Sequence, residues 1–401
     1  MSVLSGKKVL LGITGGIAAY KTPLLVRLFI KAGAEVKVIL TQEAKDFVTP
    51  LTLSTLSKNP VVIDFVQKEG NLWNNHVELG KWADFLCIAP LTANTLSKLV
   101  SGHSDNFLLA TYLSATCPVY LAPAMDLDMF RHQSTQDNFK RLTDLGHQII
   151  EPEEGELASG LVGKGRMAEP EHIFQAIETH YKKQLKLYGK QVLITAGPTY
   201  EAIDPVRFIG NHSSGKMGYA LAEVAAENGA SVTLVSGPTA LKISHPEIRV
   251  VPVVSAEEMF QAATRFFERA DVVIAAAAVA DYRPRKVAEQ KIKKKGEDLV
   301  LELEETTDIL KSLGARKSHQ FMVGFALETE HGRENAQRKL ERKNLDFIVL
   351  NSLQDRGAGF KTDTNKISII KKADVLDFDL KSKREVAQDI IREIGNALEL
   401  K

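Results

Sequence analysis

Hydrophobic and polar positions follow one another along this chain in a pattern that occurs twice. Apolar, β-branched runs that end in glycine or proline stand at 6–16 (GKKVLLGITGG) and at 189–199 (GKQVLITAGPT). Each run predicts a buried strand followed by a tight turn. Both halves continue with a glycine-ended helix and a second strand, and then with a third strand that Ala-Asp introduces, at 83–90 and 270–277.

This repeat predicts the fold class and the domain organisation. Strands that alternate with helices and are apolar throughout are typical of a parallel sheet covered on both faces. We therefore expect an α/β protein with two doubly wound, mainly parallel, Rossmann-like domains. The polar segment 180–190 (HYKKQLKLYGK) is interpreted as a helix end plus linker, which gives domains 1–186 and 187–401. The turn after the first strand of such a sheet usually faces a ligand crevice, so two ligand sites are expected.

Composition narrows the class of protein. The formal net charge is only +1, so the chain lacks the excess positive charge that attracts nucleic acid or a membrane surface. Small-molecule partners are therefore expected. The two cysteines, Cys87 and Cys117, exclude a disulfide framework and fit a reducing cytosol. We find no signal peptide and no apolar run of the roughly 18 residues that a membrane helix needs. A cytoplasmic location is therefore expected.

The first glycine turn, GITGGIAAYK at 12–21, is the first candidate site. Bare amides at the start of a helix can hold a phosphate. The turn is not a GxGxxG fingerprint, and Thr41 stands where a dinucleotide site has an acid for the ribose. These features favour a mononucleotide or another phosphate ligand over NAD. The alternative is a glycine turn that only packing requires.

Other polar residues follow the front strands. Thr92 and Asn94 come after the third strand and before a helix, where they could cap the helix or contact a ligand. His76, in NNHVELGKWAD, is either a structural or solvated histidine or part of a site. Asp126 and Ser159 are expected in loops, and the small-residue segment around Ser159 could be a lid or an ordinary surface loop.

Five front segments in this order resemble the phosphopantothenoylcysteine decarboxylases, which are flavodoxin-like flavoproteins: GITGGIAAYK, NNHVELGKWAD, APLTANTLSKLVSG, APAMDLDMF and GKGRMAEP. The resemblance implies a catalytic His76 that assists proton transfers near neutral pH. It also implies that FMN oxidises the substrate's CH₂–SH to a thioaldehyde, which accepts the electrons that loss of CO₂ releases. The residues implied to bind FMN are Gly15, Ile17, Thr41, Thr92 and Asn94.

Two of the positions that depart from that family bear on catalysis. Asp126 stands where the family usually has asparagine, and Ser159 aligns with its proton-donating cysteine. A serine hydroxyl is a far weaker acid than a thiol of pKa about 8.5. We keep both residues as catalytic candidates and expect another group to supply the final proton. The alternatives are a working ligase with an altered flavin half that stops at the ene-thiol, or a flavin-binding regulatory protein.

The rear segment GNHSSGKMG, 210–218, has the outline of a P-loop but lacks its chemistry. Met217 replaces the hydroxyl that would hold Mg²⁺, and the segment does not directly follow a strand. Asn211, Ser213 and Ser214 still present donors before a helix, which predicts an anion site. After the third strand, the alanines from Ala275 would let a flat ring or ribose approach the backbone.

The rear half also contains charged residues that could contact a ligand. Asp281 could bind a base amino group or a cation, or could cap a turn. The basic run QKIKKK, 290–295, is either a solvated face or a source of charge for a phosphate. Lys339 and Lys343 are spaced i,i+4 on a basic helix. The glycine of GFALET, Gly324, is expected at a strand end.

The rear motifs together are similar to the phosphopantothenate–cysteine ligases, and the fusion is the arrangement of the bifunctional coenzyme A biosynthesis family. The resemblance implies a homo-oligomer and an acyl-cytidylate formed from 4'-phosphopantothenate and CTP, which cysteine then attacks. Asn211 would stabilise the acyl-cytidylate, Lys291 would serve the second step or the phosphate charge, and Mg²⁺ on the triphosphate would be bound by Asp281. The residues implied to contact CTP are Ala275, Ala276, Ala277, Asp281, Lys291, Asp308, Ile309, Phe325, Lys339 and Lys343.

Overall fold

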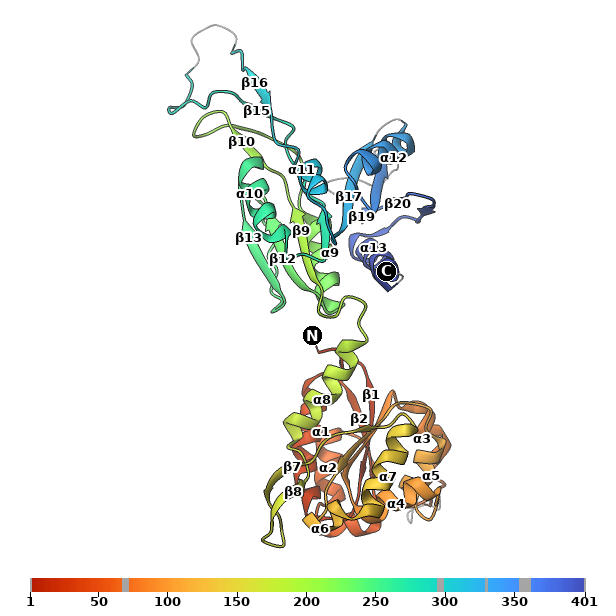
Figure 1. Cartoon of the computed structure of the whole chain (residues 1–401). Helices are drawn as coiled ribbons and strands as arrows, with labels where there is room; N and C mark the ends of the chain where they lie inside the picture. Colours follow the sequence, from red (N-terminus) through yellow and green to blue (C-terminus); the bar gives the residue numbers. More distant parts are fainter. Residues whose placement is uncertain (1, 67–71, 294–298, 329–330, 353–361, 400–401) are drawn as a thin grey trace. The chain divides into compact units, whose positions relative to one another are not determined.

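The computed structural model describes residues 2–66, 72–293, 299–328, 331–352 and 362–399. The chain divides into two compact units, Met1–Lys183 and Gln184–Lys401, which are described separately (Figure 1). The sequence placed the boundary near Lys186. Leu187 is fully buried in the core of the second unit, so that residue belongs to the rear fold and not to a linker.

The front unit is built on a six-stranded parallel sheet with the order β3-β2-β1-β4-β5-β6. The strands are β1 (Lys8–Ile13), β2 (Glu35–Leu40), β3 (Val61–Val62), β4 (Phe85–Leu91), β5 (Val119–Pro123) and β6 (Gln148–Ile149). Every residue of β4 is buried, which explains its continuous apolar run. The strand order reverses between β1 and β4, and ligands bind at such a switch point in doubly wound sheets.

Helices cover both faces of this front sheet. One face packs against α1 (Thr22–Lys31), α2 (Pro50–Ser57) and α8 (Pro170–Lys183). The other packs against α3 (His76–Trp82), α4 (Ala93–Ser101), α5 (Phe107–Ser114) and α7 (Gln133–Asp144). Short helices η1 (Ile17–Lys21), η2 (Gln42–Asp46) and α6 (Leu127–Arg131) follow β1, β2 and β5.

Ser159 lies in a loop, as the sequence suggested, and this loop connects the two strands of a β-hairpin. Strands β7 (Glu153–Glu156) and β8 (Val162–Arg166) pair antiparallel, and β8 contacts α6 (Figure 1). These strands are polar and glycine-rich, so they carry no apolar alternation that would have revealed them. Ser159 lies in the connection between the two strands.

The rear unit has an eight-stranded sheet with the order β13-β12-β9-β14-β17-β18-β20-β21. Its strands are β9 (Gln191–Ala196), β12 (Ser231–Ser236), β13 (Ile248–Pro252), β14 (Val272–Ala275), β17 (Phe321–Glu328), β18 (Phe347–Ser352), β20 (Ile367–Lys371) and β21 (Val375–Asp377). The first six in that order are parallel, whereas β20 and β21 are antiparallel. The two doubly wound, mainly parallel α/β sheets predicted from the sequence are confirmed.

Helices also cover both faces of the rear sheet. Helices α9 (Lys216–Glu227) and α13 (Lys383–Glu399) cover one face, and α10 (Ala256–Phe267), α11 (Ile309–Ala315) and α12 (Gly332–Arg342) cover the other. Gly324 lies inside β17 and not at its end. A Cβ there would lie 2.7 Å from Leu345 Cδ1, so close packing explains the glycine. No helix in the described ranges is long and apolar enough to span a bilayer.

Short two-stranded ribbons complete the rear unit. They are β10 (Tyr200–Ala202) with β11 (Phe208–Gly210), β15 (Tyr282–Pro284) with β16 (Leu303–Glu305), and β19 (Thr364–Asn365) with β22 (Lys381–Ser382). Strands β10 and β15 contact each other, so the first two ribbons lie side by side (Figure 1).

Candidate active sites

Polar residues follow three neighbouring front strands at the switch point. Thr41 comes directly after β2 and Thr92 directly after β4. After β1, Thr14 Oγ1 donates to Pro90 O at 2.7 Å and accepts from Thr92 N at 3.2 Å. This hydroxyl therefore ties the ends of β1 and β4 together at the point where a ligand is expected.

The residues predicted to bind FMN differ in whether contacts within the protein already account for them. Thr41 Oγ1 is buried without a hydrogen-bond partner in the described structure. Thr92 Oγ1 caps α4 by accepting from Thr95 N at 3.5 Å, while Asn94 is exposed on the first turn. A Cβ on Gly15 would lie 2.5 Å from Glu43 Cβ, so packing alone explains that glycine. The unsatisfied Thr41 hydroxyl is the feature that calls for a ligand, since a buried unpaired hydroxyl costs about 1–3 kcal/mol.

His76 is the first residue of α3, and an aromatic cage surrounds its imidazole. The ring centroids of Phe65, Phe107 and Trp73 lie 5.8, 6.4 and 6.5 Å away in edge contacts. Asn75 caps α3 by accepting a hydrogen bond from Val77 N at 3.1 Å, and this cap fixes the helix start at His76. His76 Nδ1 is buried and finds no partner among the described residues. This geometry favours a functional histidine over a solvated one, because a ring nitrogen is left for a ligand.

A separate cavity of about 560 Å³ lies between the turn after β1, the loop after β5 and the β7–β8 hairpin; we call it the hairpin cavity. It brings Ile17, Asp126 and Ser159 together. Asp126 caps α6 by accepting from Leu127 N at 2.6 Å, and Ser159 Oγ accepts from Leu161 N at 3.4 Å. The remaining front candidates, Gly15, Thr41, His76, Thr92 and Asn94, do not line this cavity.

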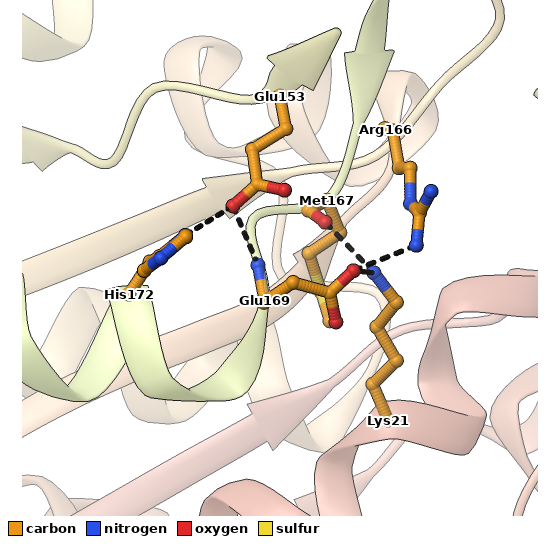
Figure 2. Close-up of polar contacts among 6 residues, drawn as sticks. All are labelled: Lys21, Glu153, Arg166, Met167, Glu169 and His172. Atoms are coloured by element: carbon orange, nitrogen blue, oxygen red, sulfur yellow. Dashed lines mark hydrogen bonds and ion pairs between the residues drawn. The ribbon is translucent and has the colours of Figure 1, made fainter. Parts of the chain in front are cut away.

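Two cations of the hairpin cavity converge on one carboxylate (Figure 2). The Lys21 side chain is only 5% exposed, and its Nζ donates to Glu169 Oε1 at 2.8 Å and to Met167 O at 3.1 Å. Arg166 Nη2 reaches the same Glu169 oxygen at 2.7 Å. The two positive charges therefore share one negative partner. Sequence analysis missed Lys21, although a lysine ending an otherwise apolar turn was a visible signal.

The cysteines do not replace the missing proton donor. Burial raises the pKa of Cys87, inside β4, to about 12. Burial likewise raises the pKa of Cys117, which precedes β5. Neither thiol lines the hairpin cavity, so the donor that completes the reaction must be sought elsewhere.

An ion pair beside the Lys21, Arg166 and Glu169 cluster gives the front unit a pH-dependent contact. His172 Nδ1 lies 2.5 Å from Glu153 Oε1, and this hydrogen bond raises the pKa of His172 (Figure 2). Burial raises the pKa of Glu153, but hydrogen bonds from Glu169 N and His172 outweigh it and lower that pKa overall.

We expect His172→Gln to destabilise the front unit more at pH 6 than at pH 9. A raised histidine pKa contributes stability below the unfolded pKa, and that stability is lost as pH rises through the folded pKa. The loss in Tm at pH 6 should be about 2 °C, because the pair is exposed. Thermal denaturation of both proteins at the two pH values checks this, and an equal loss at both would contradict it.

The rear unit has a cavity of about 440 Å³, here called the rear cavity, at the carboxyl ends of its parallel strands. It lies beside β14, β17 and the loop before α11. The structure brings the following predicted CTP contacts together in its wall: Ala275, Ala277, Asp281, Asp308, Ile309, Phe325, Lys339 and Lys343. Ala276 lines a neighbouring cavity, and Lys291 lines neither.

Two lysines and one aspartate form a charged cluster in the rear cavity. Asp308 caps α11 through Lys311 N at 3.0 Å and pairs with Lys343 Nζ at 2.9 Å. Burial raises the pKa of Asp308, but Lys343 and the Lys311 amide outweigh it and lower that pKa overall. Lys339 Nζ donates to Phe325 O at 2.8 Å, and burial together with nearby Lys343 lowers its pKa. Both lysines line the rear cavity, where their charge is available to an anionic ligand.

A smaller cavity of about 160 Å³ adjoins the rear cavity, since Ala277 and Phe325 line both. One wall is the start of α9, with Ser213 to Gly218. The other includes Lys383, which is 8% exposed, and Asn351, whose Oδ1 is buried without a partner in the described structure. Sequence analysis predicted the α9 wall but missed Asn351, which lies in β18, and Lys383, which begins α13, because nothing local to either residue shows that it faces α9.

Asn211 lines neither rear cavity, but its side chain is hydrogen-bonded to one residue of each. Its Nδ2 donates to Ala278 O at 3.1 Å and to Val279 O at 3.2 Å, and these two residues line the smaller and the larger cavity respectively. Lys291 is exposed, and its neighbour Ile292 donates its amide to Asp204 Oδ2 at 3.2 Å. The last two lysines of the basic run lie outside the described residues.

Within the described part of the chain, no group of three or more His, Cys, Asp or Glu side chains could hold a metal ion. Asp281 shares the rear cavity with Glu305 and Asp308. A magnesium ion there would depend on a nucleotide's phosphates for most of its ligands, as is usual for Mg²⁺.

Two family models divide the chain between them. The Flavoprotein family matches residues 2–182, and the DNA/pantothenate metabolism flavoprotein C-terminal domain matches 187–398. The coenzyme A biosynthesis bifunctional protein CoaBC of Bacillus subtilis (strain 168) is 45% identical over 396 residues, covering 98% of each chain. The chain belongs to the CoaBC family. The resemblance inferred from the sequence is therefore confirmed in both halves.

Other relatives extend this comparison. CoaBC of Escherichia coli (strain K12) is 42% identical over 370 residues, 91% of each chain. A protein named cysteine/cysteine sulfinic acid decarboxylase, from an unknown prokaryotic organism, is 54% identical over 353 residues. That alignment covers 86% of this chain and 98% of the relative. Relatives with differently named activities thus match most of the same chain.

Proposed function

We propose that the rear unit joins 4'-phosphopantothenate to cysteine with CTP, and that the front unit decarboxylates the product to 4'-phosphopantetheine. The observation that carries the proposal is membership of the CoaBC family across both units. The clustering of the implied nucleotide contacts in one cavity supports it.

In the rear unit, the substrate carboxylate attacks the α-phosphate of CTP and pyrophosphate leaves; the amine of cysteine then displaces CMP. Lys339 and Lys343 supply positive charge to the rear cavity, and Asp281 is the protein ligand for Mg²⁺. The start of α9 with Lys383 offers an anion site next to it. Asn211, which is hydrogen-bonded to one residue of each cavity, stabilises the acyl-cytidylate, and Lys291 serves the second step or the phosphate charge.

In the front unit, FMN binds at the switch point, where the buried Thr41 hydroxyl needs a partner. When bound, FMN supplies an acceptor and later a donor of two electrons for the substrate's CH₂–SH carbon. His76 moves the accompanying proton; its Nδ1 has no partner among the described residues. His76 does not line the hairpin cavity of its own copy, which fits a homo-oligomer whose copies complete each other's site.

Affinity for CTP should fall as pH rises above neutrality. Because burial lowers the pKa of Lys339, this lysine loses its charge at a lower pH than an ordinary lysine. We expect Kd to rise between pH 7 and pH 9.5 in the wild type. Calorimetric titration of CTP with Mg²⁺ measures this.

The matched variants for that experiment are Lys339→Gln and the exposed Lys311→Gln on α11. Lys339→Gln should bind CTP weakly at pH 7 and lose most of the pH dependence. Lys311→Gln should behave like the wild type. An unchanged pH profile in the Lys339 variant would assign the titration to another group.

The proposal as a whole is tested by mass spectrometry after the protein is mixed with phosphopantothenate, cysteine and CTP. The full reaction gives phosphopantetheine. A front unit altered by Ser159 and Asp126 stops at phosphopantothenoylcysteine or an ene-thiol. A purely regulatory flavoprotein forms no product, and that result would remove the proposal.

A second activity, decarboxylation of free cysteine by the front unit, is favoured by one specific observation. The relative named cysteine/cysteine sulfinic acid decarboxylase is 54% identical to this chain. Residue 126 of this chain, in the hairpin cavity, is also an aspartate where the phosphopantothenoylcysteine decarboxylases usually have asparagine. Release of CO₂ from cysteine without CTP or phosphopantothenate tests it.

A further inference from the structure

The imidazole of His76 is held by ring contacts and not by a hydrogen bond at Nδ1. This nitrogen is buried and has no partner in the part of the chain that the structure describes. His147 shows the more common arrangement, since its Nε2 lies 2.7 Å from Tyr112 Oη. A histidine that moves protons is generally oriented by a hydrogen bond to its second ring nitrogen. In His76 another kind of contact must therefore fix the orientation of the ring.

Three aromatic rings supply such contacts, and each meets the imidazole edge to face. The planes of Phe65, Trp73 and Phe107 are inclined to the imidazole plane by 82°, 72° and 87°. The three residues come from the segment after β3, the approach to α3 and the first turn of α5, and α3 packs on α5 (Figure 1). Because edge-to-face contact is a favourable geometry for aromatic rings, the three together favour one orientation of the imidazole.

Trp73 is the ring of this cage that core packing does not explain. Phe107 is 1% exposed and belongs to the core of the front unit, and Phe65 packs against that core. Trp73, in contrast, is 61% exposed, so its side chain gains little from burial. Its place is nevertheless well defined. The indole stacks on Phe65 at 5.6 Å, and the Trp73 backbone forms an antiparallel bridge with Val66.

The residue after Trp73 strengthens this arrangement. Asn74 N donates to Phe65 O at 2.8 Å, and Asn74 Nδ2 donates to Asp64 O at 2.7 Å. These two hydrogen bonds join the segment after β3 to the approach to α3, two residues before His76. The indole is therefore held beside the imidazole by backbone and ring contacts, although most of its own surface is exposed.

We propose that Trp73 is a positioning residue whose ring, backed by Phe65, holds the His76 imidazole in the orientation that proton transfer requires. This inference rests on the proposed decarboxylase activity of the front unit, in which His76 moves the proton. Trp73 acts through His76 and does not itself contact the substrate. Its loss therefore slows the chemical step and leaves substrate binding unchanged.

The experiment compares full-length, FMN-loaded wild type with Trp73→Leu, Trp73→Phe and Trp82→Phe. Leucine keeps apolar bulk but removes the ring, and phenylalanine restores a ring edge. Trp82 is the chain's other tryptophan and serves as the control; it ends α3, and its ring lies 4.2 Å from Lys37 Nζ. The values of kcat and KM for CO₂ release are determined with phosphopantothenoylcysteine and with free cysteine. The melting temperature, flavin spectrum and sedimentation of each protein are recorded alongside.

On the substrate that wild type accepts, we expect Trp73→Leu to lower kcat by about 10-fold to 10²-fold and to keep KM within about twofold. Trp73→Phe should recover most of kcat, and Trp82→Phe should match the wild type. A raised KM at the wild-type kcat would make Trp73 a substrate contact, and a changed oligomer size would make it a subunit contact. Either result, or an unchanged kcat, overturns this inference and leaves the decarboxylase proposal standing. A wild type that decarboxylates neither substrate overturns both.

Discussion

Replacing His76 with asparagine is expected to abolish CO₂ release from phosphopantothenoylcysteine, with a loss of at least about 10²-fold to 10⁴-fold. The imidazole lies in a cage of Phe65, Trp73 and Phe107, and its buried Nδ1 has no partner in the described structure. Asparagine can neither accept nor return a proton near neutral pH. CO₂ release in a single turnover, with CMP formation followed in parallel, measures the effect.

The matched control is His103→Asn, since His103 is exposed after α4. It lines neither the hairpin cavity nor the aromatic cage around His76. Both variants should keep the wild-type rate of CMP formation, because the rear unit folds around its own sheet. Loss of CMP formation in His76→Asn would contradict independent sites. Persistent CO₂ release would remove His76 from the catalytic role.

The reverse pattern is expected for Asn211→Asp: amide synthesis should fall by at least about 10²-fold while decarboxylation of added phosphopantothenoylcysteine continues. Asn211 Nδ2 donates to two backbone carbonyls, Ala278 O and Val279 O. A carboxylate cannot donate to them, and its charge would face both carbonyl oxygens and the phosphates of the nucleotide. The rate of CMP release is the measurement.

Asn396→Asp is a suitable control for that variant, because Asn396 lies on α13 and accepts a hydrogen bond from Lys186 that aspartate can also accept. It should ligate at the wild-type rate. If Asn211→Asp forms the amide normally, Asn211 is a loop-positioning residue and its assignment to the acyl-cytidylate is wrong.

The sequence predicted those parts of the fold that repeat or are strongly apolar. Continuous apolar runs located the parallel strands, and glycine turns located the crevices at their carboxyl ends. The rear site was predicted most fully, because its residues follow consecutive strands of one parallel sheet. Ala275, Asp281 and Phe325 therefore meet at a single edge.

The features that sequence analysis missed depend on contacts between distant segments. The β7–β8 hairpin is polar and carries no periodic signal, so only its pairing and its contact with α6 define it. Lys383 begins the last helix, yet it faces the start of α9 across the smaller rear cavity. Nothing local to Lys383 indicates that neighbour. The front residues were also expected to form one site, whereas Ser159 and His76 lie apart within one copy.

The buried position of Leu187 sets a limit on how this chain can be divided. Its side chain is fully enclosed, its amide donates to Asn228 O, and the adjacent Lys186 packs on Gly395 of the final helix. A protease that cuts between Lys183 and Gln184 should release a ligase fragment with its hydrophobic interior complete. A gene split only a few codons later would remove the buried Leu187 side chain from that interior. It would also remove Lys186, which packs on the last helix.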